Sequence, residues 1–183
     1  PIVAMTRRLL NLILHYEQTD TYARKHPLKW HFDNPGRLVD LTERPRWFHG
    51  SAPSSFFRLD VLLEQGLRFD DRVRPNFEDG HFFIRYMLGL EEQKVVLVSA
   101  AEYYYRKRAT GSSTLQVSQM DPRRYTDVME FGYLDALQRA AERFGSAPEW
   151  VQNFILYELG WFFSLSESGK AGVGLVDEDV RSR

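Results

Sequence analysis

The sequence contains no cysteine, and this absence limits the chemistry open to the protein. Without cysteine the chain forms no disulfide and offers no thiolate, which fits a reducing compartment such as the cytoplasm. An excess of charge of either sign is also missing, because 24 basic and 25 acidic side chains give a formal net charge of −1. Non-specific binding to nucleic acid needs a basic surface that neutralises phosphates, so we predict no nucleic-acid partner.

Long apolar runs are missing as well. No stretch reaches the ~20 apolar residues that a membrane-spanning helix needs, and the best stretch, 154–165, is too short and contains Glu158. A short apolar run after Arg7 and Arg8 superficially resembles a secretory signal, but Asn11 interrupts it and no small-residue cleavage site follows. We therefore expect a cytoplasmic protein, with peripheral contact with the inner face of the membrane as a further expectation.

The composition supports a packed core and a mixed arrangement of helices and strands. The 183 residues are 43% hydrophobic and 14% aromatic, enough for one domain or a fragment of a larger one. The helices predicted from apolar spacing cover 3–23, 59–66, 125–144 and 149–163, and another begins at Glu78. The predicted strands cover 95–98 and 102–108, and frequent prolines predict a loop over 25–53.

The two carboxyl-terminal helices carry different apolar patterns. In the first helix, one apolar stripe is expected to consist of Phe131, Leu134, Leu137, Ala141 and Phe144. The second helix opens with a capping box, Ser146-Ala147-Pro148-Glu149, and is apolar nearly all round. We therefore expect the second helix to be mostly buried.

Glu78 and Asp79 stand at the start of a predicted helix. Acidic residues are common in a first helical turn because they interact favourably with free backbone N–H groups, so both can be simple caps. In the alternative interpretation, one carboxylate is a general base that takes a proton from a hydroxyl, and its neighbour holds the geometry. The spacing of the residues leaves both interpretations open.

A strand of tyrosines and basic residues ends at Arg108 and leads into a loop rich in hydroxyl groups. With a period of two, Arg106 and Arg108 share the face of Tyr104, whereas the odd-numbered residues face the other way. Two guanidinium groups followed by the loop of Ser112 and Ser113 suit a diphosphate, because arginine binds phosphate oxygens bidentately. An exposed edge strand, protected from aggregation by its charges, explains the same residues equally well.

The histidines show no spacing typical of a metal site, so the sequence itself indicates no metal ligands. A structural role is the default for His15, His26, His31, His49 and His81. Because His81 follows Asp79 by two residues, His81 is also a candidate for the pocket of Asp79.

In their order along the chain, these motifs resemble family 2 glycosyltransferases, whose domain has the GT-A fold. The resemblance is carried by Phe56-Phe57-Arg58, Leu67-Arg68-Phe69-Asp70, Phe77-Glu78-Asp79, Tyr104-Tyr105-Arg106 and Ser112-Ser113-Thr114. Flanking motifs are similar to those of bacterial teichoic-acid glycosyltransferases, which are often fused to a CDP-glycerol glycerophosphotransferase. These motifs are His26-Pro27-Leu28, Val39-Asp40-Leu41, Arg74-Pro75-Asn76 and Trp150-Val151-Gln152-Asn153.

The resemblance implies an inverting enzyme that moves a sugar from a nucleotide-sugar donor to a hydroxyl of a teichoic-acid-like cell-wall polymer. It implies Asp79 as the base and Glu78 as its partner. The implied contacts with the diphosphate or substrate are Arg106, Arg108, Ser112 and Ser113. A divalent metal, Mg²⁺ or Mn²⁺, is expected in the complete domain, although the nucleotide-binding βαβ unit with its Asp-x-Asp motif does not occur in residues 1–183.

The resulting expectation is an α/β chain that forms the acceptor-side half of a GT-A domain and carries a helical extension. The expected segments are 1–120 for that half, 121–165 for the extension and 166–183 for a linker or tail. The missing amino-terminal half, or a fused transferase domain, is expected as a partner. Sugar transfer depends on one concave site shared by Asp79 and Arg106 or Arg108. The alternative is a non-catalytic domain that binds a protein or polymer, which an exposed aromatic stripe on the 148–163 helix would favour.

Overall fold

A computed structural model describes residues 11–24, 26–33, 36–110, 118 and 121–167. Its strands are β1 (Asn11–Tyr16), β2 (Thr21–Arg24), β3 (Arg37–Asp40), β4 (Lys94–Leu97) and β5 (Glu102–Lys107). Its α-helices are α1 (Leu59–Glu64), α2 (Glu78–Leu88), α4 (Asp135–Phe144) and α5 (Glu149–Glu167). Short 3-10 helices span η1 (Lys29–Phe32), η2 (Ala52–Ser54) and η3 (Pro122–Tyr125), and the π-helical η4 covers Val128–Leu134. The predicted α/β class with a helical carboxyl-terminal region is confirmed.

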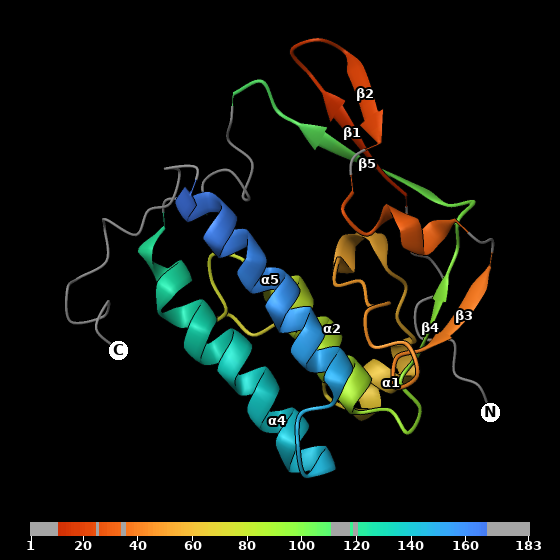
Figure 1. Ribbon diagram of the computed structural model, residues 1–183, viewed down its shortest axis with the longest axis vertical. Helices are drawn as coiled ribbons and strands as arrows, with labels where there is room; N and C mark the ends of the chain where they lie inside the picture. Colours follow the sequence, from red (N-terminus) through yellow and green to blue (C-terminus); the bar gives the residue numbers. More distant parts are fainter. Residues whose placement is uncertain (1–10, 25, 34–35, 111–117, 119–120, 168–183) are drawn as a thin grey trace.

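The strands form two small sheets beside the helices (Figure 1). In the three-stranded sheet, ordered β2-β1-β5, the central β1 runs antiparallel to β2 and parallel to β5. Strands β3 and β4 form a separate antiparallel pair. The strands predicted over 95–98 and 102–108 are therefore confirmed, with boundaries shifted by a residue at most.

The helix predicted over 3–23 is wrong in its described part, which forms the β1–β2 hairpin. The chain reverses at Asp20, whose φ of 47° lies in the left-handed region, and the Asp20 carboxylate contacts His15 Nε2 at 2.8 Å. The other partner of β1 is β5, where Ile13 lies opposite Tyr104. Hydrogen bonds to a strand this distant in sequence leave no trace in the local spacing of apolar residues.

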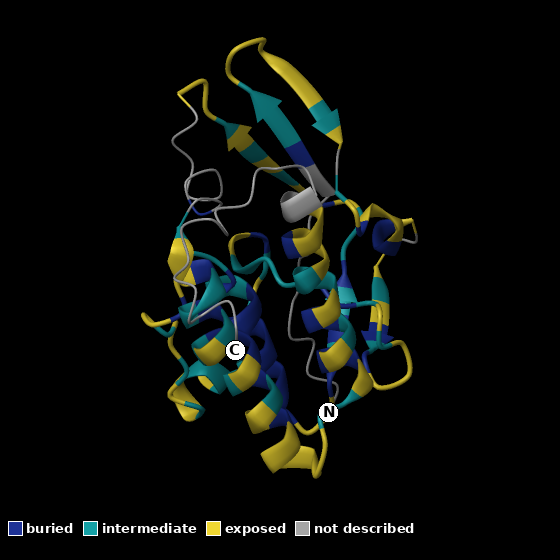
Figure 2. Ribbon diagram, turned by 60° about the vertical axis from the view of Figure 1, so that its left-hand side comes forward, coloured by how far each residue is buried: buried dark blue, intermediate teal, exposed yellow. Residues whose placement is uncertain are grey.

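The core lies where α2, α4 and α5 meet, and the helices turn their buried sides toward one another (Figure 2). Phe83 of α2 is 1% exposed and its ring meets those of Trp150 and Phe154 of α5 edge-on, at 6.4 and 5.9 Å. Full burial of one such ring contributes roughly 1.5–3 kcal/mol to stability. No helix in the described part of the chain combines the length and apolar character needed to cross a bilayer.

Both carboxyl-terminal helices form as predicted, but their buried faces differ from the prediction. The segment η4–α4 turns Gly132, Ala136 and Ala140 into the core, whereas Leu134 and Phe144 of the predicted stripe are exposed. The small residues let the neighbouring α2 approach closely. The π-helical η4 has more residues per turn than an α-helix, so the residues that face the core differ from those that a period of 3.6 predicts.

The prediction that the last helix is mostly buried is wrong for one side of α5. Leu156, Trp161 and Phe163 are 63%, 44% and 69% exposed, respectively. The core covers the side of α5 that carries Trp150 and Phe154, and Leu156 and Phe163 lie on the opposite side. Trp161 follows Phe154 by seven residues, so it lies on the core-facing side and is exposed near the end of the helix. Nearly uniform apolar character therefore does not imply burial on every side of this helix.

Candidate functional site

The predicted helix at Glu78 is confirmed as α2, and an unusual backbone conformation precedes it. Phe77 has a φ of 74°, in the left-handed region that a bulky residue adopts only when its surroundings impose it. Its buried ring packs on Tyr133 at 4.4 Å. A Cβ at Gly80 would lie 2.6 Å from this ring and one at Gly132 2.9 Å, so both glycines make room for it. The packing of Phe77 thus fixes where the first turn of α2 points.

Glu78 and Asp79, in that first turn, line a cavity of about 420 Å³. We call it the carboxylate cavity. Its walls come from the loop before η1, from residues 49–53 after β3, from the start of α2 and the residues just before it, from β5 and from α5. The lining residues are His26, Leu28, His49, Gly50, Ser51, Pro53, Pro75, Asn76, Phe77, Glu78, Asp79, Gly80, Tyr105, Phe154, Tyr157 and Glu158. Among the described lining residues there are three carboxylates and neither lysine nor arginine.

Asp79 also lines a smaller cavity of about 170 Å³ that adjoins the first. The two cavities share His26, His49, Ser51, Pro53, Asp79 and Tyr105, and the smaller one adds Ser54 and Tyr103. Asp79 therefore lies where both spaces meet, and a ligand in either space can reach it.

Burial gives two of the carboxyl groups unusual proton affinities. Burial, and then the charge of Glu78, raise the pKa of Asp79 to about 7, against an opposing hydrogen bond from the backbone N–H of Ala52. Burial also raises the pKa of Glu158 to about 7; the Arg124 guanidinium opposes this rise and the Asp79 charge adds to it. A carboxylate that exchanges its proton near neutral pH has the affinity that general-base catalysis needs.

The structure does not bring Arg106 and Arg108 into this cavity. Arg106 is 61% exposed in its side chain, with its Nε 3.2 Å from a carboxylate oxygen of Glu17, and Arg108 is exposed. The predicted alternation of β5 is confirmed, but the face toward the two cavities carries Tyr103 and Tyr105. The expected single site of Asp79 and the arginines is thus not found among the described residues. Ser112 and Ser113 lie outside them.

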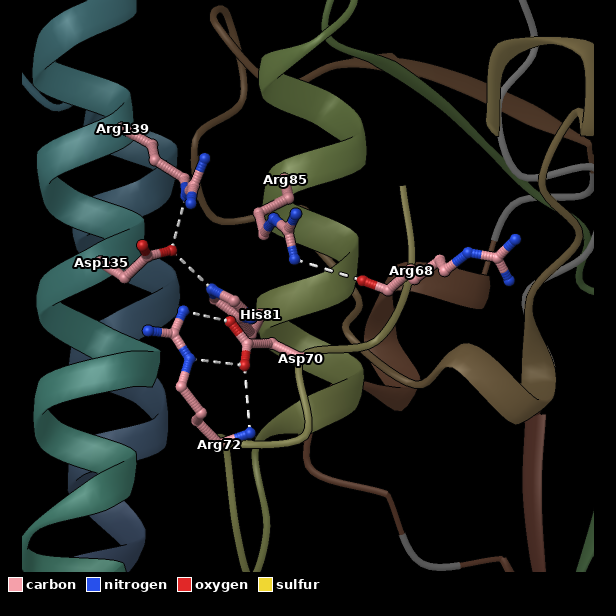
Figure 3. A network of polar contacts seen from close by, with 7 residues as sticks. All are labelled: Arg68, Asp70, Arg72, His81, Arg85, Asp135 and Arg139. Carbon is pink, nitrogen blue, oxygen red and sulfur yellow. Dashed lines mark hydrogen bonds and ion pairs between the residues drawn. The ribbon is translucent and has the colours of Figure 1, made fainter. Parts of the chain in front are cut away.

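His81 does not face the carboxylate cavity, although it follows Asp79 by two residues. It is 1% exposed, and its Nε2 lies 2.7 Å from Oδ2 of Asp135 on α4 (Figure 3). Two residues along a helix correspond to about 200°, which puts neighbouring positions of this spacing on opposite sides. The sequence-based placement of His81 in the same pocket is therefore wrong.

A separate cavity of about 440 Å³ carries the opposite charge. It lies between α2 and α4, and its lining includes Arg85, Arg139, Arg143 and Glu142. Two of these arginines already have partners, since Arg139 donates to Asp135 and Arg85 to the carbonyl of Arg68 (Figure 3). The carboxylate cavity, and not this one, is therefore the cavity that offers groups for proton transfer.

The described residues contain no group of three or more histidine, aspartate or glutamate side chains placed to hold a metal ion. The donor sets that Mg²⁺ and Mn²⁺ prefer are built from several oxygen ligands converging on one point. The described part of the chain therefore does not fit a metal by itself.

Three residues of the carboxylate cavity were not singled out from the sequence. His26, although part of the motif His26-Pro27-Leu28, and His49 have only a structural role by default, because nothing local indicates their position beside Asp79. Glu158 did give a signal, because it is a lone carboxylate inside a strongly apolar helix.

Comparison with known proteins finds one informative relative. The chain is 25% identical over 137 residues to the minor teichoic acid biosynthesis protein GgaA of Bacillus subtilis (strain 168). The matched region is 75% of this chain and 30% of that protein, so the chain spans less than a third of its relative. No protein-family model matches the chain. No solved structure matches it significantly.

Proposed function

We propose that this chain is the acceptor-side part of an inverting glycosyltransferase that adds a sugar to a hydroxyl of a teichoic-acid-like cell-wall polymer. The observation that carries the proposal is the position of Asp79, a carboxyl group with a pKa near 7 in the wall of a 420 Å³ cavity. The similarity to a teichoic acid biosynthesis protein supports the polymer class. The sequence-based expectation tied sugar transfer to a site shared with Arg106 or Arg108, which the described residues do not form, so the proposal rests on Asp79 and its cavity instead.

In the proposed reaction, ionised Asp79 accepts the proton of the acceptor hydroxyl as its oxygen attacks the anomeric carbon of the donor sugar. The nucleoside diphosphate leaves from the opposite face, so the configuration inverts. Glu78, the neighbouring charge, increases the proton affinity of Asp79. Because the described walls hold three carboxylates and no cation, the cavity suits an uncharged acceptor hydroxyl better than the diphosphate.

The donor's diphosphate therefore has to be held elsewhere in the complete protein. Arg106 and Arg108, outside the cavity at the edge strand β5, remain proposals for that role, as do Ser112 and Ser113. A divalent metal also remains a proposal for the complete protein, and no step here depends on it. Association with the inner face of the membrane is likewise a proposal for the complete protein.

The test is sugar transfer by the full-length protein. Radiolabelled nucleotide sugars are offered with a teichoic-acid polymer, and the product is analysed for label and anomeric configuration. Asp79→Asn should lower kcat by roughly 10²–10⁴-fold, as loss of a general base does. At pH 8 its unfolding midpoint should be no lower than that of the wild type, because the amide removes a buried charge. Near-normal transfer by this variant, or retention of configuration, would reject the assignment.

One observation favours the alternative of a non-catalytic interaction domain. Leu156 and Phe163 form an exposed apolar side of α5, which is typical of a surface that contacts another polypeptide or a polymer. In the enzyme proposal, further polypeptide of the complete protein covers it. A double Leu156→Ser, Phe163→Ser variant and the Asp79→Asn variant separate the two functions. An interaction domain keeps its role with Asp79→Asn and loses it with the double variant.

A further inference from the structure

Two histidines in the wall of the carboxylate cavity share the same local hydrogen bond. The backbone N–H of Leu28 donates to Nδ1 of His26 over 3.1 Å, and that of Ser51 donates to Nδ1 of His49 over 3.3 Å. An imidazole nitrogen that accepts an N–H carries no proton itself. A neutral ring with this contact must carry its proton on Nε2.

Both rings are held in the neutral form. Burial lowers the pKa of His26, and burial followed by the charges of His26 and His31 lowers the pKa of His49 to about 3. The two rings stack with centroids 5.3 Å apart and planes 19° apart, so a charge on one would oppose a charge on the other. Each backbone contact therefore selects a single tautomer with an Nε2–H donor.

The position of the pair matches what the carboxylates lack. His26 and His49 line both cavities at which Asp79 lies. Ionised carboxylates only accept hydrogen bonds. They can therefore bind the O–H groups of a ligand, but they donate no hydrogen bond to its hydroxyl oxygens. With no lysine or arginine in the described lining, the imidazoles offer donors that carry no charge. Uncharged donors beside acceptors are the complement of a hydroxyl group, which both donates and accepts.

From this juxtaposition we propose that His26 and His49 bind the hydroxyl oxygens of an uncharged, polyhydroxylated acceptor through their Nε2–H groups, next to Asp79. This role rests on the proposed function, because only sugar transfer makes the bound molecule an acceptor. The ligand class of this cavity is then a neutral sugar or polyol unit, and the two histidines are binding residues rather than structural ones.

The first test is binding, which requires no catalysis. The full-length protein is labelled with ¹⁵N at histidine, and long-range ¹H–¹⁵N spectra report the tautomer of each ring. We expect His26 and His49 as Nε2–H tautomers at pH 7, with Nε2 signals that shift on addition of glycerol or methyl N-acetylglucosaminide. Inorganic pyrophosphate is the competing probe. Charged or Nδ1–H rings, no shift with either neutral probe, or a shift with pyrophosphate alone would overturn the proposal.

The second test is kinetic and uses His26, the less buried ring. His26→Phe keeps the stacking on His49 but removes the donor, so KM for the acceptor should rise about five- to tenfold while KM for the donor stays unchanged. His26→Gln places an amide N–H near the position of Nε2 and should restore most of the affinity. A rise that Gln fails to rescue, or a rise in donor KM instead, contradicts the binding role.

His31 provides the matched control. Its imidazole is stacked on Trp47 at 5.0 Å and fully buried, but it lines neither cavity. His31→Phe should leave acceptor KM unchanged. The two proposals can fail separately: shifts by neutral probes without any sugar transfer reject the enzyme, whereas transfer that depends on Asp79 with histidines that respond only to pyrophosphate rejects the inference.

Discussion

His81 and Asp135 meet with 2.7 Å between Nε2 and Oδ2, and their contact joins α2 to α4 (Figure 3). The same carboxylate oxygen accepts a 2.6 Å hydrogen bond from Nε of Arg139. His81 is almost fully buried, and its Nδ1 has no hydrogen-bond partner among the described residues. Asp135 therefore supplies the contact that compensates for burying this ring, and it helps to hold the helix that presents the candidate base.

Loss of this carboxylate should destabilise the protein. Asp135→Ala leaves a buried imidazole without its contact, which costs roughly 1–3 kcal/mol in the free energy of unfolding. Chemical denaturation at pH 7 measures the change. The control is Asp71→Ala, because the Asp71 side chain is 94% exposed and its ion pair with Arg74 is long, at 3.4 Å. Equal losses in the two variants would show that the contact with His81 contributes nothing specific.

The glycines of the helices should respond to alanine in opposite directions. Gly80→Ala puts a Cβ 2.6 Å from the Phe77 ring, so the start of α2 must shift, at a cost of roughly 1–3 kcal/mol. In α5, Gly160→Ala meets nothing within 4 Å and should stabilise the helix by up to about 1 kcal/mol. Thermal unfolding of both variants gives the sign. Stabilisation by Gly80→Ala would refute the packing described for Phe77.

The sequence predicts the elements whose signals are local. Acidic residues before an apolar repeat of 3.6 residues locate α2, and Asp79 with it, because helix starts are determined by adjacent residues. The β1–β2 hairpin was missed because β1 is held by β5, a strand far away along the chain. Local periodicity contains no information about such a partner.

The composition of the carboxylate cavity was beyond prediction for a related reason. His26, His49 and Glu158 come from segments that only tertiary packing brings to Asp79. Alternation along β5 correctly separates Arg106 from its neighbours, but it cannot say which face turns toward the cavity. That choice follows from how the sheet packs, and it excludes the arginine from the lining.

The proton affinity of Asp79 should appear in the pH dependence of stability. Its pKa rises from 3.8 to about 7 on folding, so the folded state holds this proton more tightly than the unfolded state. Between about pH 4 and pH 7 the unfolded chain releases the proton first, and stability therefore falls as pH rises, then levels off. Asp79→Asn should flatten part of this decline, while Glu158 maintains the rest. Denaturation curves from pH 4 to 8 measure the slope, and an unchanged slope would contradict a buried carboxyl at position 79.

The charge of Glu78 should raise the pH at which the proposed sugar transfer begins. After burial, this charge is the next cause of the raised Asp79 pKa, so Glu78→Gln should lower that pKa and move the acidic limb of the kcat/KM profile to lower pH. A shift of up to about one pH unit is expected for one neighbouring charge. The maximal rate should fall only modestly, since a weaker base accepts the proton less readily. Loss of activity at every pH without movement of the limb would instead mean that Glu78 positions the substrate. If the pKa of Asp79 shifts in this way with the charge of Glu78, the two carboxylates share a confined, poorly solvated space, because water would otherwise screen their interaction.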